Sequence, residues 1–179
     1  MKNKIHLIIL LFISSIISVK ASVATNSNLP DNEDEFEVLM QKIRLDFAKN
    51  PSIDEALKKY NETDGSFTDV DYSSIQRTKW PPLEHVDRLY DFAFAYTNSK
   101  NKYYKDESLF TKIEKGLEYW HERNPWCHNW WYNQIAEPQR LGVLLIQLRI
   151  GEKHLNTELE NKILERIKTD GGDPAEWTG

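Results

Sequence analysis

Cysteine is almost absent from this chain of 179 residues, which contains Cys127 alone. A single cysteine cannot form an internal disulfide, so stability must come from packing, and we expect Cys127 to be a partly buried filler rather than a reactive thiol. Glycine and proline number only 7 each, which excludes collagen-like and low-complexity classes. No spacing of cysteine, histidine and acidic residues matches a metal site, so we predict neither a metal nor a cofactor.

The chain also lacks an apolar run long enough for a confident membrane span. Lys2 and Lys4 precede a mostly apolar stretch over 7–19 that serines interrupt, and small residues before position 22 suit cleavage after Ala21. We therefore predict a signal peptide over 1–21, with a retained anchor as the alternative, and a secreted or periplasmic protein. The polar residues 22–34 have no periodicity and predict a flexible leader.

Positive charge is scarce. The net charge is −5, and removal of the signal, with its three lysines, leaves 20 basic against 28 acidic residues, or −8. An acidic chain is a poor general partner for polyanions, so we exclude nucleic acid. Local groups must hold any acidic ligand. We expect a monomer without a stable membrane span after cleavage.

Apolar residues recur at helical spacing along the mature chain, and no alternating strand of useful length appears. Ser52 with Glu55 suggests a capping box, and Trp80-Pro81-Pro82 ends a loop that begins at Gly65. Pro138 suits the first turn of a helix that Gly151 caps. The pattern predicts an all-α fold of antiparallel hairpins, with helices near 36–47, 52–60, 83–96, 107–122, 138–149 and 155–167.

The segment 124–140 concentrates aromatic rings and amide side chains. A pyranose ring packs its C–H face on an indole, and amides both donate to and accept from hydroxyls, so this composition favours sugar binding. The alternative is that the tryptophans fill a helical core, which we favour for Trp126 alone. We place a loop over 126–133, where Trp130 and Trp131 cannot both point inward, so we expect at least one to be exposed.

Asn129-Trp130-Trp131-Tyr132-Asn133-Gln134-Ile135, followed by Pro138 and a leucine-rich helix, resembles the Asn-Trp-Trp signature of polysaccharide lyase family 8. That family includes hyaluronate, chondroitin AC and xanthan lyases. The resemblance implies that residues 35–179 belong to an N-terminal incomplete α/α toroid, and that the ligand is a glycosaminoglycan-like acidic polysaccharide. Its implied substrate-binding residues are Asn129, Trp130, Trp131, Tyr132, Asn133, Gln134 and Arg140, although Gln134 stands where relatives often carry Glu.

The family's reaction is β-elimination at a uronic acid, and the resemblance implies an Asn, a His, a Tyr and an Arg as its catalytic groups. The Asn typically lies in a Thr-Gly-Ala-Asn run. Thr178-Gly179 matches the first half, so we expect no catalytic residue within this chain, which looks cut short. We interpret the remaining histidines, at 85, 121, 128 and 154, as surface or loop residues, and Arg140 and Arg149 as helix-surface residues in solvent or in salt bridges.

Three hypotheses follow from the sequence. The first is an N-terminal piece of a secreted polysaccharide lyase that keeps part of the substrate cleft but lacks the elimination groups. The second is a non-catalytic carbohydrate-binding module. The third is a helical protein-interaction domain that uses an open apolar face.

Overall fold

The computed structural model describes residues 35–150 and 154–170. These residues form six α-helices and one π-helical turn. The predicted signal peptide and leader, the Gly151 cap and the Thr178-Gly179 run lie outside the described residues. The chain divides into two compact units at Phe47, and α2 (Glu35–Asp46) belongs to the first. Its acidic first turn and Arg44 in its last turn suit the helix dipole.

The second unit begins with α3 (Asp54–Lys59), which is shorter than predicted. The capping box at Ser52 is wrong, because Ile53 occupies the N-cap position and no side chain caps the helix. The segment 60–82 that follows is irregular, as expected, apart from an isolated antiparallel bridge between Tyr60 and Phe67. Gly65 has a φ of 84°, and a Cβ there would meet the Lys115 carbonyl oxygen at 2.5 Å, so only glycine fits this close turn.

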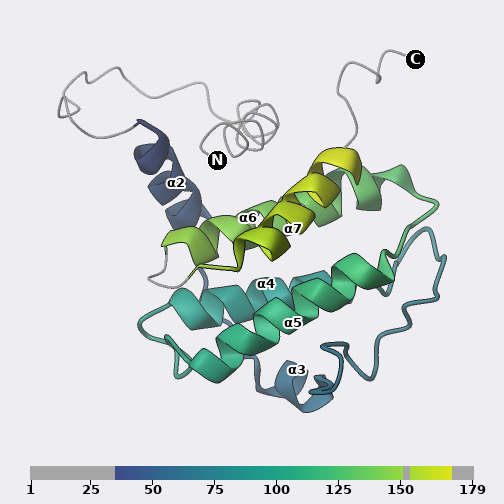
Figure 1. The fold of residues 1–179 in the computed structure, drawn as a ribbon, viewed down its shortest axis with the longest axis horizontal. Helices are drawn as coiled ribbons and strands as arrows, with labels where there is room; N and C mark the ends of the chain where they lie inside the picture. The colour runs from purple at the N-terminus through teal and green to yellow at the C-terminus, as the bar shows by residue number, and fades with distance from the viewer. Residues whose placement is uncertain (1–34, 151–153, 171–179) are drawn as a thin grey trace. The chain divides into compact units, whose positions relative to one another are not determined.

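The helices α4 (Leu83–Thr97) and α5 (Glu107–Arg123) form the first hairpin (Figure 1). The Asp106 carboxylate accepts from the Leu109 N–H at 3.0 Å and caps α5, while Asn124 ends it in the left-handed conformation, with φ of 45°. Gly116 lets the two helices approach closely, because a Cβ there would lie 2.6 Å from a Leu89 methyl group.

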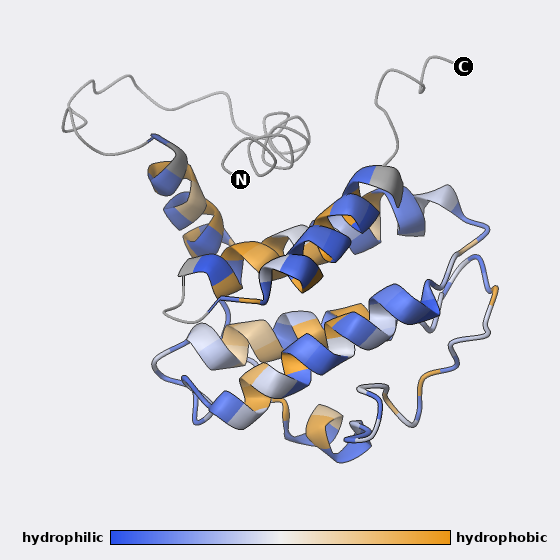
Figure 2. Ribbon diagram, viewed as in Figure 1, coloured by the Kyte–Doolittle hydropathy of each residue, from blue (hydrophilic) through white to orange (hydrophobic). Residues whose placement is uncertain are grey.

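A second hairpin consists of α6 (Glu137–Ile150) and α7 (Thr157–Asp170). α4 packs on α5 and α6, and α7 packs on α5 and α6, so the four helices enclose one core. Figure 2 shows hydrophilic residues along one side of α5 and α7 and hydrophobic residues along the other. Leu117, Leu144 and Ile163 are fully buried in this core. The predicted all-α class is confirmed for the residues that the structure describes.

Candidate carbohydrate-binding site

The tryptophan pair stands at the start of a helix. Trp130 and Trp131 already have helical backbone, so the loop predicted through Asn133 is wrong after Asn129. The cause is a local cap: the Asn129 side-chain oxygen accepts from the Trp131 N–H at 3.1 Å. The two indoles therefore project from the first turn of a regular element.

A π-helical turn, η1 (Tyr132–Ala136), joins this first turn to α6. The Glu137 N–H donates to the Tyr132 carbonyl, which is the wider hydrogen-bond spacing of a π-helix. Pro138 follows as the second residue of α6 and has no N–H to donate. The helical backbone therefore continues through Pro138 from the π-turn before it. The sequence pattern had predicted that a helix begins at this proline.

Three tryptophans of this segment face solvent. Trp130 is 57 % exposed and Trp131 is 43 % exposed, so the prediction that at least one is exposed is confirmed for both. Trp126 is also 57 % exposed, and its expected place in the core is wrong. Its ring meets that of His128 edge-on at 5.1 Å, and Trp131 meets Tyr132 edge-on at 5.2 Å.

Asn129 and Tyr132 hold a distant loop beside the tryptophan pair. The Asn129 side-chain amide donates to the Arg77 carbonyl at 2.8 Å, and the Tyr132 hydroxyl donates to the Thr78 carbonyl at 2.7 Å. The segment 76–79 therefore lies against the start of the helix that carries both indoles. Sequence reasoning missed this contact, because more than fifty positions separate the partners.

The other predicted binding residues have mixed environments. Asn133 is buried, and its side chain accepts from the Cys127 N–H at 3.0 Å and donates to the Cys127 carbonyl at 2.7 Å. It therefore shapes the preceding loop instead of facing solvent, and Cys127 is buried with it. Gln134 is half-buried, and within the described residues its side chain makes no hydrogen bond.

Arg140 lies half-buried on α6 and pairs with Asp87 of α4. It also donates to the Ala136 carbonyl at 3.1 Å. Burial raises the pKa of Asp87, although Arg140 opposes this rise. The expectation of salt bridging is confirmed for Arg140 and also for Arg149, which pairs with Glu160.

Buried aromatic rings pack against Tyr132, the residue that follows the tryptophan pair. Tyr132 contacts Trp80 at 5.8 Å between ring centres, and Trp80 meets Trp120 edge-on at 6.0 Å. The next ring is His85, which stacks on Trp120 at 5.3 Å and is fully buried. The expected surface position of His85 is therefore wrong.

A consistent set of hydrogen bonds keeps His85 neutral. Its Nε2 lies 2.9 Å from the Gly116 carbonyl and must carry the proton, while Nδ1 lies 2.8 Å from the Tyr72 hydroxyl. That hydroxyl accepts from the Phe67 N–H at 2.8 Å, so its own proton points to Nδ1. Burial lowers the pKa of His85 to about 4.

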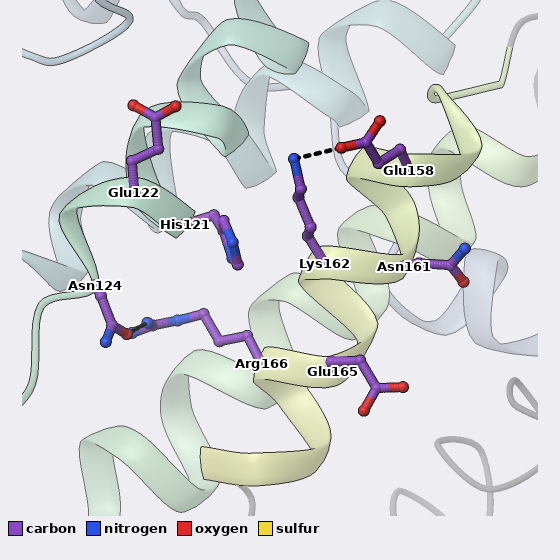
Figure 3. A pocket seen from close by; sticks show the side chains of 8 residues that line it. All are labelled: His121, Glu122, Asn124, Glu158, Asn161, Lys162, Glu165 and Arg166. Carbon is purple, nitrogen blue, oxygen red and sulfur yellow. Dashed lines mark hydrogen bonds and ion pairs between the residues drawn. The ribbon is translucent and has the colours of Figure 1, made fainter.

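A buried ion pair fixes the loop before the tryptophan pair. Arg166 of α7 pairs with Glu137, donates to the Pro125 carbonyl at 2.9 Å and reaches the Asn124 side chain. Glu137 also accepts from the Trp120 indole N–H at 2.8 Å. Figure 3 shows Arg166 extending from α7 toward Asn124 at the end of α5.

The same view shows a hollow of about 840 Å³ between the end of α5 and α7. Both acidic and basic side chains line it, and Lys162 is already paired with Glu158 at 2.8 Å. This balance gives the hollow no preference for a polyanion. The exposed indoles are the better candidate for a binding site.

Other types of site have little support. Among residues 35–150 and 154–170, no group of three histidine, cysteine or acidic side chains is arranged to hold a metal ion. No described helix has the length and apolar character needed to cross a membrane.

Comparison with known proteins places this chain in a family. The model for the N-terminal α-helical domain of polysaccharide lyase family 8 matches residues 25–179. The chain belongs to polysaccharide lyase family 8. Chondroitinase-AC of Pedobacter heparinus, which is similar to this family 8 chain, is 37 % identical over 147 residues, covering 80 % of this chain and 21 % of the relative.

A solved structure gives the same relationship in three dimensions. This family 8 chain is similar to a chondroitinase AC lyase that was studied in complexes with oligosaccharides, with a TM-score of 0.73 and 36 % identity. The match covers 80 % of this chain and 22 % of the other. The chain thus spans about one fifth of the length of these relatives.

Proposed function

We propose that this region supplies a carbohydrate-binding face to a lyase that cleaves uronic-acid-containing polysaccharides by β-elimination. The observation that carries the proposal is the exposure of both Trp130 and Trp131 on one capped helical turn. Membership of polysaccharide lyase family 8 supports the reaction type. The similarity to chondroitinase AC supports a glycosaminoglycan of the chondroitin or hyaluronan type as the ligand.

The geometry of the aromatic face suits sugar rings. An exposed indole offers a flat apolar surface on which the C–H face of a pyranose packs. The Asn129 cap and the Tyr132 hydrogen bond fix the backbone beneath both rings. A fixed platform loses little conformational entropy when a ligand binds, so more of the contact energy appears as affinity.

Three described residues that could move a proton are poorly suited to do so. A base that removes a proton from the sugar must touch it, yet His85 is fully buried. The Tyr132 hydroxyl is already donated to Thr78, and burial raises the pKa of Tyr90 to about 12. Such a phenol does not ionise near neutral pH. The elimination groups are proposed to lie outside residues 35–170, as the resemblance to the family implies.

The proposed location is outside the cytoplasm. It rests on the basic start, apolar stretch and small-residue cleavage site of residues 1–21. Residues 22–34 are proposed to act as a leader before the helical region.

Direct binding tests the aromatic face. Titration calorimetry with chondroitin and hyaluronan hexasaccharides should show that changing Trp130→Ala together with Trp131→Ala weakens binding tenfold or more, as expected for central aromatic contacts. Tyr104→Ala is a matched control, because Tyr104 is 42 % exposed on the turn between α4 and α5. Unchanged affinity in the double variant would refute the aromatic face.

The catalytic part of the proposal has its own assay. Incubation of the 179-residue chain with hyaluronan or chondroitin should give no rise in the ultraviolet absorbance of unsaturated products. A rise that depends on protein concentration would place elimination groups within this chain.

A further inference from the structure

The tryptophan pair has cationic neighbours that the sequence pattern did not reveal. Arg77 and Lys79 flank Thr78 in the loop that Asn129 and Tyr132 hold. Both side chains are exposed, and within the described residues neither forms an ion pair or a side-chain hydrogen bond. Two exposed, unpaired cations thus belong to the loop whose backbone is bonded to Asn129 and Tyr132, the neighbours of the two indoles in the chain.

Most of the other described cations in the second unit are already paired with a carboxylate. Arg88 binds Asp69, Arg140 binds Asp87, and Arg166 binds Glu137. The carboxylate of an ion pair offsets the field of its cation, whereas the field of an unpaired cation is reduced by solvent alone. In a chain with a net charge of −5, such local cations are what an anionic ligand needs.

The loop that carries these cations is held in place. The Trp80 indole donates to the Ser74 carbonyl at 3.1 Å, and the Cys127 thiol lies 3.4 Å from the Gln76 carbonyl. Together with the bonds from Asn129 and Tyr132, these contacts fix the loop backbone at both sides of Arg77. The backbone that carries both cations therefore has a defined position against the start of the helix with the indoles.

We propose that Arg77 and Lys79 form an anion subsite, which binds the acidic groups of the polysaccharide while the indoles bind its rings. The planar guanidinium of Arg77 matches a carboxylate or a sulfate ester with two parallel hydrogen bonds, and the Lys79 ammonium adds a mobile point charge. This inference rests on the proposed function, because it assigns the charge selectivity of the same binding face.

Three hexasaccharides separate charge recognition from ring stacking: hyaluronan, with carboxylates alone, chondroitin sulfate, with carboxylates and sulfates, and carboxyl-reduced hyaluronan, which is neutral. Arg77→Gln with Lys79→Gln should weaken binding of the charged ligands about three- to tenfold in low salt and leave the neutral ligand unaffected. The loss of affinity in the variant should become smaller as the salt concentration is raised, because salt screens exposed charges.

Two control variants accompany this test. Lys59→Gln with Lys100→Gln removes the same charge from exposed lysines in α3 and in the turn after α4, and it should leave binding unchanged. Arg77→Lys with Lys79→Arg keeps the charge and should retain most of the affinity. Thermal unfolding of each variant shows that the fold persists.

The outcomes are distinct. Equal losses on both charged ligands assign the contact to carboxylate, and a loss confined to chondroitin sulfate assigns it to sulfate. Affinity equal to that of the lysine control, or an equal loss on the neutral ligand, overturns the subsite. Changing Trp130→Ala with Trp131→Ala should weaken all three ligands, so failure of the aromatic face is seen separately.

Discussion

The described tryptophans fall into two groups that differ in burial and in the partners of their indole N–H groups. Trp80 and Trp120 are buried, and each indole N–H has a partner, the Ser74 carbonyl and the Glu137 carboxylate. Trp126, Trp130 and Trp131 follow Trp120 closely in the chain and are exposed. A buried indole must satisfy its N–H within the protein, whereas an exposed one keeps its face open to a ligand. Local partners, not the residue itself, decide which role a tryptophan has.

The largest effect is expected from the buried group. Trp120→Ala should lower the free energy of unfolding by about 3–5 kcal/mol, because it opens a cavity in the core. It also removes the N–H that Glu137 accepts. Urea denaturation followed by circular dichroism measures the change. A loss below about 1 kcal/mol would mean that the core does not depend on this ring.

The buried histidine that stacks on Trp120 should make stability depend on pH. The pKa of His85 falls from 6.5 to about 4 on folding because of burial. Between these values the unfolded chain binds a proton that the folded protein rejects. The contribution of His85 to the free energy of unfolding is therefore fully present above about pH 6.5. It falls by about 3 kcal/mol in total as the pH drops to about 4.

Denaturant unfolding at a series of pH values tests this dependence. His85→Gln removes the titrating group, so the variant should be less stable near pH 7 but should lose less stability between pH 6.5 and 4. Identical pH profiles for the two proteins would contradict a buried neutral imidazole.

The smallest effect on stability is expected from the exposed group. Trp126→Ala should change the free energy of unfolding by no more than about 0.5 kcal/mol, as is usual for exposed side chains. The midpoint of thermal unfolding measures this change. A loss as large as that of Trp120→Ala would erase the distinction between the two groups.

Helical periodicity predicted most of the fold because the core faces of these helices are continuous. The stripes of α4, α5 and α7 depend only on spacing along the chain, which the sequence displays directly. His85 shares such a stripe with Leu89 and Phe92, so its burial had a signal that the sequence interpretation overlooked. Its partners Tyr72 and Gly116 come from other elements and had none.

The candidate site was less predictable. The residue types and the family signature drew attention to Trp130 and Trp131, and their exposure agrees with that expectation. The Asn129 cap, the π-turn before Pro138 and the contact with Arg77 were not foreseen. The cap depends on a local side-chain hydrogen bond, the π-turn on how Pro138 is accommodated, and the contact with Arg77 on tertiary packing, which a single sequence does not reveal.

The hydrogen bond from Arg166 to the Pro125 carbonyl joins the loop before the indoles to a helix that is synthesised later. The indoles are synthesised before Arg166, which bonds to the Pro125 carbonyl and follows Pro125 by forty-one positions. A nascent chain that ends before α7 would lack the Arg166 hydrogen bond to Pro125, so the loop before the tryptophans would not be held in place. Under the proposed function, the second hairpin therefore belongs to the smallest unit in which the loop before the indoles is held in place.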